Sequence, residues 1–176
     1  MNRIWTVGHS NHSIEEFLGI LKAHGIEAVL DVRRFPASRK WPHFNAERLA
    51  ESLPASGIEY AGEPELGGRR KAKPGSPHTA WRVEAFRGYA DFMDTPEFAE
   101  GLERAMALGR ERRSALMCAE ALPWRCHRSL IADALFAREW EVFEILSERE
   151  ARPHELPDFA RLEGARVIYD RGELPI

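Results

Sequence analysis

The segment LMCAEALPWRCHR, residues 116–128, concentrates groups that can do chemistry. It holds both cysteines of the chain, a histidine, a glutamate and two arginines. Cys126 stands beside Arg125 at a predicted helix start, a setting that lowers the pKa of a thiol. Cys118, at the end of an apolar run, also fits a thiol that packs as a small hydrophobic side chain. Both cysteines are therefore candidate reactive thiols.

Two specific kinds of site fit this segment poorly. In a phosphatase-like loop, five residues separate the cysteine from the arginine, whereas six separate Cys118 from Arg125. Glu120 also interrupts the run of backbone amides that would bind the phosphate. A zinc site would need three or four ligands. Cys126 and His127 could contribute, yet the chain has no short-spaced ligand pair. A metal-dependent or thiol-dependent enzyme that uses Cys118, Cys126 and His127 remains an alternative.

A third interpretation of the segment is favoured. In it, Glu120 serves as a general acid or base, and His127 and Arg128 hold an anionic substrate. These residues follow an apolar run that predicts a strand over 113–119. In parallel sheets, ligands bind beyond the carboxyl ends of the strands. The third interpretation therefore places a substrate at the end of this strand.

Polar side chains also follow the other predicted strands. GHSNHS follows a strand over 3–8, DVRRFPASRK follows one over 26–33, and ELGGRR follows one over 58–62. Histidine titrates near neutral pH, and arginine binds phosphate in a bidentate manner. The candidate catalytic residues are His9, Asp31, Glu120 and His127. The candidate anion-binding residues are Ser10, Arg33, Arg39, Gly67, Gly68 and Arg128.

The stretch 63–80 reads as a long basic surface loop. Five basic residues occur from Arg69 to Arg82, a stretch that also contains His78 and Trp81. Positive charge combined with aromatic side chains is typical of proteins that bind single-stranded nucleic acid. A non-catalytic nucleic-acid-binding protein that uses residues 69–82 is therefore a second alternative.

Apolar runs alternate with helical patterns along most of the chain. Ser13, Asn45 and Thr95 are predicted helix N-caps, and Pro54 predicts an early end to the helix after Asn45. Further helices are predicted over 81–94 and 126–139, and strands over 141–148 and 166–170. This order predicts a single α/β domain with a mostly parallel sheet and helices on both faces, of Rossmann-like or flavodoxin-like layering. Residues 152–176 form a weakly patterned C-terminal extension.

Composition restricts the classes of protein. The chain has 176 residues, 44% hydrophobic and 30% charged, with a formal net charge of −3. This length suits one domain, and the charge excludes a globally basic coat for nucleic acid. An apolar run of membrane-spanning length, a secretory signal and a disulfide framework are all lacking, which predicts a cytoplasmic protein. The sequence defines neither a cofactor nor an oligomeric state.

Five ordered motifs together resemble the bacterial and archaeal family known as domain of unknown function 488. They are TVGHSNHSIEEFL, VLDVRRFPASRKWPHFN, YAGEPELGGRR, GYADFM and LMCAEALPWRCHRSLIADAL. The resemblance extends from Thr6 to about Ile145. It implies a small α/β domain and one shared constellation of motifs, and it supplies no reaction. The family's recurring positions correspond to Gly8, His9, Ser10, Asp31, Arg33, Pro36, Ser38, Phe44, Asn45, Leu66, Gly67, Gly68, Tyr89, Cys118, Glu120, Cys126, His127 and Arg128.

The sequence as a whole predicts a polar, anion-binding pocket at the carboxyl ends of the strands. A phosphate-bearing substrate, such as a nucleotide or a nucleic-acid end, suits the arginines. The sequence therefore predicts an enzyme, or a former enzyme, that acts on such a substrate.

Overall fold

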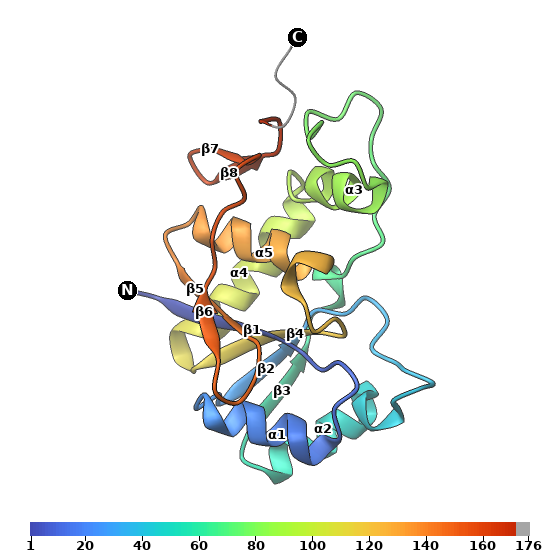
Figure 1. The fold of residues 1–176 in the computed structure, drawn as a ribbon, viewed down its shortest axis with the longest axis vertical. Coiled ribbons are helices and arrows are strands. Elements are labelled where there is room, and N and C mark those ends of the chain that lie inside the picture. The colour runs from blue at the N-terminus through green and yellow to red at the C-terminus, as the bar shows by residue number, and fades with distance from the viewer. Residues whose placement is uncertain (172–176) are drawn as a thin grey trace.

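Buried, largely apolar runs of four to six residues form the centre of the main sheet in the computed structural model, which describes residues 1–171. The strand order is β3-β2-β4-β1-β5-β6, and all neighbours are parallel except β5 and β6. Figure 1 shows the sheet near the middle of the molecule. The strands are β1 (Arg3–Gly8), β2 (Ala28–Asp31), β3 (Glu59–Gly62), β4 (Ser114–Cys118), β5 (Glu141–Ile145) and β6 (Ala151–Pro153).

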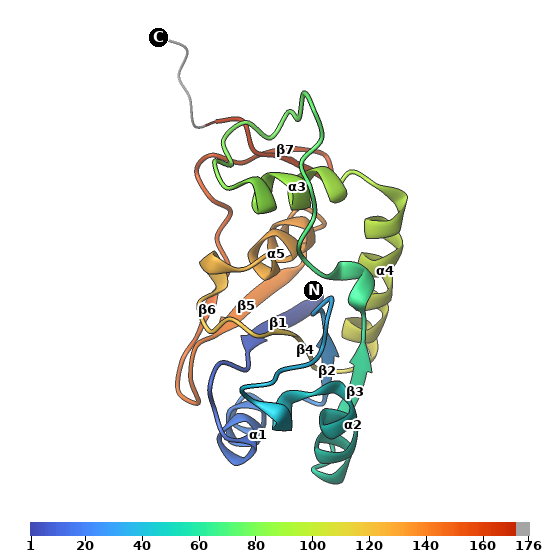
Figure 2. The ribbon, with the colours of Figure 1, turned by 90° about the vertical axis from the view of Figure 1, so that its right-hand side faces the viewer.

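Helices cover both faces of this sheet, as the alternation of patterns predicts. On one face, Phe17 and Leu21 of α1 and Leu49 of α2 pack on Trp5 and Val29. The other face is covered by a second core that includes residues of α4 and α5 (Figures 1 and 2). The predicted α/β domain is confirmed. The helices are α1 (Ile14–Ala23), α2 (Ala46–Ala55), α3 (Glu84–Phe92), α4 (Pro96–Glu111) and α5 (Arg128–Phe136).

Two of the three predicted helix caps are formed. The hydroxyl of Ser13 accepts a hydrogen bond from the Glu16 amide, and the hydroxyl of Thr95 accepts one from the Phe98 amide. Asn45 occupies the N-cap position of α2, but its side chain accepts from the Ser38 amide, 2.6 Å away. The asparagine therefore tethers the preceding loop and leaves the helix end uncapped.

The two central strands, β1 and β4, lie side by side but lead into helices on opposite faces. The chain leaves β1 for α1 and leaves β4 for α5. Such a reversal opens a crevice at the carboxyl ends of the two strands, where α/β proteins bind their ligands. His9 and Ser10 follow β1, and the segment 119–127 follows β4.

Short 3-10 helices and a small hairpin complete the described chain. The 3-10 helices are η1 (Pro42–Phe44), η2 (Pro64–Leu66) and η3 (Pro123–Arg125). Residues 67–83, most of the predicted basic loop, form no helix or strand. Strands β7 (Arg161–Glu163) and β8 (Arg166–Ile168) form an antiparallel hairpin at the same end of the molecule as α3 (Figure 1). No helix in residues 1–171 is long and apolar enough to cross a membrane.

Candidate functional site

A cavity of about 790 Å³ opens at the carboxyl ends of β1, β2 and β4. Its walls come from the segments that follow these strands, from Gly68 and Arg69, and from α3. Five arginines and lysines line it, against one carboxylate, Glu120. The basic residues of the lining are Arg33, Arg34, Lys40, Arg69 and Arg125.

Backbone contacts hold the two central walls of the cavity together. The amides of His9 and Ser10 donate to the carbonyls of Cys118 and Ala119, at 2.9 and 3.0 Å. A Cβ on Gly8 would lie 1.8 Å from the Glu120 carbonyl oxygen, so only glycine permits this approach. Ser10 adopts a positive φ of 49° immediately afterwards. This tight turn keeps His9 beside Cys118.

Arg33 is fixed from beneath by Asp31. Nε of Arg33 donates to Oδ1 of Asp31 at 2.8 Å, and Nη2 donates to Oδ2 at 2.7 Å. The Tyr60 hydroxyl also donates to Oδ2 of Asp31 at 2.7 Å. Burial opposes the charge on Arg33, but the bonds to Asp31 outweigh it and raise the pKa of Arg33. Asp31 lies outside the cavity lining and serves to orient the guanidinium.

His9 is a neutral imidazole at pH 7, because burial lowers its pKa to about 4. Nδ1 lies 2.9 Å from the Ser10 carbonyl oxygen, which requires the proton on Nδ1. Nε2 then accepts from Nη1 of Arg33 at 3.3 Å. The ring also stacks on Phe44, with centroids 4.3 Å apart. His9 therefore supports the orientation of Arg33, and the lone pair on its Nε2 is already engaged by the guanidinium.

Cys118 and Cys126 are in direct contact in the wall of the cavity, with their Sγ atoms 3.1 Å apart. The hydrogen bond from Cys126, aided by the charge of Arg128, outweighs burial and lowers the pKa of Cys118 to about 7. The same hydrogen bond and burial raise the pKa of Cys126. Cys118 is therefore the thiol that ionises first.

His127 lies next to this pair. Its Nε2 is 3.2 Å from the Val32 carbonyl oxygen, and its Nδ1 is 3.4 Å from Sγ of Cys126. Burial lowers the pKa of His127 to about 4. The ring is therefore neutral, with its proton on Nε2 and an open lone pair on Nδ1. Gly68 packs against this edge of the ring, where a Cβ would lie 3.0 Å from Nδ1.

Arg128 is fully buried behind the same wall. Its Nη2 donates to the Ala121 carbonyl at a long 3.4 Å, while Nε and Nη1 have no partner among the described residues. A buried guanidinium with two unused donors is costly unless an anion lies near it. Arg128 does not line the cavity, although Cys118 and Ala121 beside it do.

The remaining predicted site residues divide between the cavity and its surroundings. Glu120 lines the cavity, and its Oε1 accepts from the Leu122 amide at 3.3 Å. Gly67 lies outside the lining, pressed against Arg34 where a Cβ would clash at 2.3 Å. Arg39 is exposed and also lies outside the lining.

Several residues of the site carry no clear signal in the sequence. Tyr60 lies on β3, and its contact with Asp31 depends on the β2–β3 register. Phe35, Trp41 and Phe86 give the cavity aromatic walls. The guanidinium groups of Arg34 and Arg69 lie 5.7 and 5.5 Å from the exposed Phe35 ring. The basic residues after β2 could be identified from the sequence, but this aromatic surface could not.

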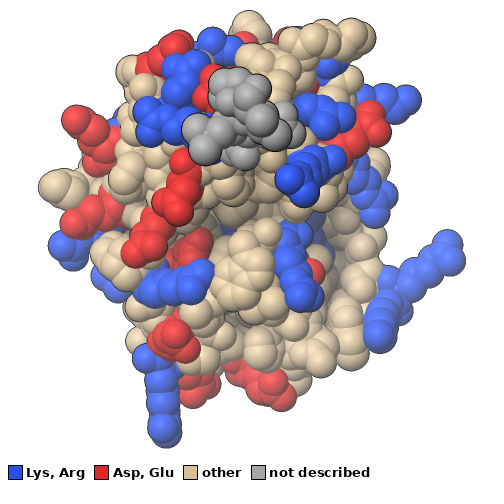
Figure 3. Space-filling view, turned by 45° about the horizontal axis from the view of Figure 1, so that its top comes forward, with Lys and Arg blue, Asp and Glu red and all other residues tan. Residues whose placement is uncertain are grey.

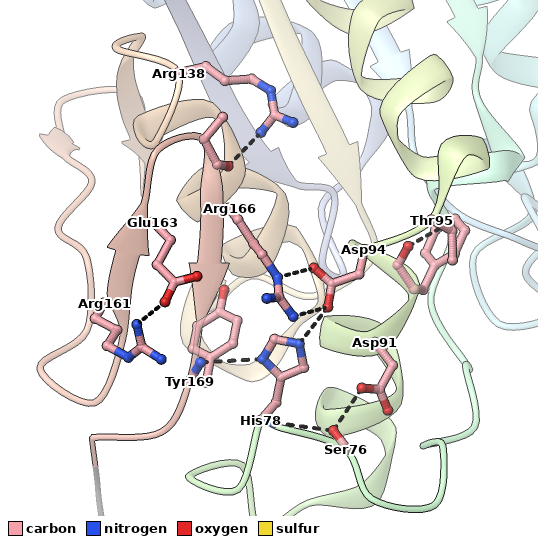
Figure 4. Close-up of polar contacts among 12 residues, drawn as sticks. Ser76, His78, Asp91, Asp94, Thr95, Arg138, Arg161, Glu163, Arg166 and Tyr169 are labelled. Carbon is pink, nitrogen blue, oxygen red and sulfur yellow. Dashed lines mark hydrogen bonds and ion pairs between the residues drawn. The ribbon is translucent and has the colours of Figure 1, made fainter.

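Polar contacts tie the basic segment to its surroundings (Figure 4). The Ser76 hydroxyl donates to Asp91 of α3 at 2.7 Å. The fully buried His78 contacts Asp94 at 3.0 Å through Nε2 and accepts from the Tyr169 amide through Nδ1. Figure 3 views the molecule with this end brought forward, and basic and acidic side chains are interspersed there. This face presents no uniform positive surface.

Among residues 1–171, no three side chains of His, Cys, Asp or Glu are grouped so that they could hold a metal ion. The described part of the chain therefore offers no ready metal centre of that kind.

The fold and the cavity define a doubly wound α/β protein with a polar pocket at its topological switch point. A family model described as "Domain of unknown function DUF488" matches residues 13–135 of the 176. The chain belongs to this family, as the motif resemblance predicted. No curated protein and no solved structure matches the chain.

Proposed function

We propose that the cavity binds a phosphate-bearing substrate, a nucleotide or a nucleic-acid end, and that the chain is an enzyme acting on it. The charge of the lining carries this proposal: five basic side chains against one carboxylate, in a chain whose net charge is −3. Arg33 is paired with Asp31 beneath the lining, so the other four basic side chains supply the excess positive charge. Guanidinium groups bind phosphate oxygens through paired, charge-assisted hydrogen bonds. The aromatic side chains Phe35, Trp41 and Phe86 offer faces on which a nucleobase can stack.

Within this proposal the residues have distinct roles. Arg33 is the preorganised phosphate ligand, because Asp31 and His9 fix its guanidinium before any substrate arrives. Arg34, Lys40, Arg69 and Arg125 complete the anion site. Glu120 is the proton acceptor or donor, since it is the only carboxylate of the lining. The neutral His127 is the second candidate for proton transfer. No cofactor is assigned.

Calorimetric titration with adenosine diphosphate and with inorganic phosphate tests the binding half. Replacing Arg34 and Arg125 by glutamine should weaken nucleotide binding by about a hundredfold, since each lost charge-assisted contact costs roughly tenfold. The matched control replaces Arg48 and Arg149, exposed arginines outside the cavity lining, and should bind as the wild type does. Equal affinities of the two double variants, or no saturable binding by the wild type, would overturn the proposal.

Phosphorus NMR of the protein with a panel of nucleotides and phosphate esters tests the catalytic half. Glu120→Gln should lower the turnover of any substrate found by about a hundredfold, the size of a typical acid–base contribution. Its affinity for the substrate should stay close to that of the wild type, because the glutamine keeps the shape of the side chain. Unchanged turnover would remove Glu120 from the mechanism.

The same titrations with a single-stranded oligonucleotide distinguish this proposal from the alternative of a non-catalytic nucleic-acid-binding protein. Lys71 and Lys73 lie on the basic segment and outside the cavity lining. Replacing both by glutamine should leave nucleotide binding unchanged. If that replacement alone abolishes salt-sensitive oligonucleotide binding, the 69–82 segment is the binding surface and the cavity is not.

A further inference from the structure

The two cysteines of the chain form a preassembled pair. Cys118 ends the central strand β4, and Cys126 follows η3, so the intervening loop folds back to bring them together. Their Sγ atoms lie 3.1 Å apart. Both residues border the cavity and both are buried, Cys118 with 1% and Cys126 with 9% of its surface exposed. A disulfide bond is about 2 Å long, so the two sulfur atoms would have to approach each other by about 1 Å.

A buried cation, Arg128, lies beside the two thiols. This fully buried guanidinium leaves Nε and Nη1 without a partner among the described residues. Its charge lowers the pKa of both neighbouring thiols, after the larger effects of their mutual hydrogen bond and of burial. A buried cation with unused donors next to a thiol stabilises the thiolate, which is the reactive form.

We propose that Cys118 and Cys126 are a redox-active dithiol that exchanges with a low-molecular-weight disulfide entering the cavity, with Cys118 as the attacking sulfur, Cys126 as the resolving sulfur and Arg128 as their buried counter-ion. This inference stands apart from the phosphate proposal, since it requires only that the cavity admit a small disulfide.

The exchange balances in two steps. The Cys118 thiolate attacks one sulfur of the incoming disulfide, forms a mixed disulfide and releases the first thiolate. The Cys126 sulfur then attacks Sγ of Cys118, forms the internal disulfide and releases the second thiolate. The protein dithiol is oxidised by two electrons and the small disulfide is reduced to two thiols.

The contact between the thiols also accounts for the order of the two sulfurs. In the reduced protein the Cys126 proton is held by the hydrogen bond to Cys118, which is the largest cause of its raised pKa. The mixed disulfide removes the negative charge on Cys118, and the charge of Arg128 remains to favour a Cys126 thiolate. The proton of Cys126 is then released to solvent through the cavity that Cys126 borders.

Mass spectrometry of the whole chain after exposure to oxidised glutathione tests the proposal. The wild type should lose two hydrogen atoms and retain no glutathione. Cys126→Ser should accumulate one glutathione on Cys118, because the resolving sulfur is missing. Cys118→Ser should react at least about tenfold more slowly than Cys126→Ser, since its remaining thiol lacks the activated neighbour. A wild type that stays reduced, or that keeps glutathione bound, would overturn the proposal.

The pH profile of the wild-type reaction tests the proposal independently of whether the serine variants fold. The oxidation rate should rise with a midpoint near pH 7, where Cys118 ionises, and a midpoint near the ordinary thiol pKa of 9.0 would contradict activation of the thiol. Arg128→Lys retains the charge and should keep the midpoint, whereas Arg128→Met should move it upward. An unchanged midpoint in Arg128→Met would remove Arg128 from the proposed role.

Discussion

At the scale of single residues, the site depends on buried polar groups that satisfy one another. Asp31 accepts three side-chain hydrogen bonds, two from Arg33 and one from the Tyr60 hydroxyl. Burial and the bond to Asp31 raise the pKa of Tyr60, which keeps its hydroxyl a donor throughout the physiological range. These contacts position Arg33 at the cavity, so the carboxylate acts through the arginine.

Removing one member of this group should expose the dependence. Asp31→Asn leaves the Arg33 guanidinium buried without a counter-charge, so the free energy of unfolding should fall by about 3 kcal/mol. Tyr60→Phe removes one neutral donor and should cost about 1 kcal/mol. Urea unfolding of both variants measures the difference. A loss in Asp31→Asn that is no larger than in Tyr60→Phe would show that the pair contributes little.

At the scale of elements, much of the arrangement could be predicted, because strand patterns, caps and the parallel order are local or generic signals. The edge of the sheet at β6 was harder to predict. Strand β6 spans three residues, too few for a pattern, and its pairing with β5 depends on tertiary contacts. The ring of polar strand ends was expected, but Tyr60 and the contact between Cys118 and Cys126 depend on register and loop folding, which spacing alone does not reveal.

The close approach of β1 to the loop after β4 gives a prediction at this scale. Gly8→Ala would press a methyl group into the Glu120 carbonyl, so the free energy of unfolding should fall by about 3 kcal/mol. Gly62→Ala is the matched control, since a Cβ there meets nothing within 4 Å, and it should stay within about 0.5 kcal/mol of the wild type. Thermal unfolding of both variants compares them. Equal stabilities would mean that the loop moves away without cost.

At the scale of the whole molecule, a buried ionic cluster joins the segment after β5 to β5 and α5. His154, just after β6, contacts Glu144 of β5 through Nδ1 at 2.8 Å and Asp133 of α5 through Nε2 at 2.6 Å. The Tyr169 hydroxyl donates to Asp133 as well, at 2.6 Å. Burial disfavours the charged imidazole, but the bonds to both carboxylates outweigh it and raise the pKa of His154 to about 9.

This cluster should make stability depend on alkaline pH. The pKa of His154 rises from 6.5 in the unfolded chain to about 9 in the folded one, so its contribution is complete below pH 6.5 and disappears as the pH rises through 9. The loss should approach about 3 kcal/mol. Urea unfolding between pH 6 and 10 measures it, and His154→Gln should flatten the curve in this range. A wild type whose stability is constant up to pH 10 would contradict the assignment.

The outer edge of the sheet, beyond β6, has a consequence for how copies of the protein meet in solution. The amide of His154 donates inward to the Val142 carbonyl. Arg152 pairs with Glu144 in the antiparallel register, so its backbone groups also point inward. Because the direction alternates along a strand, the backbone groups of residues 151 and 153 point outward. Position 153 is a proline, which has no amide hydrogen, so this short edge offers a neighbouring strand little to pair with. Strand-by-strand stacking of molecules is therefore disfavoured on this side, and concentrated samples should resist fibrous self-association through it.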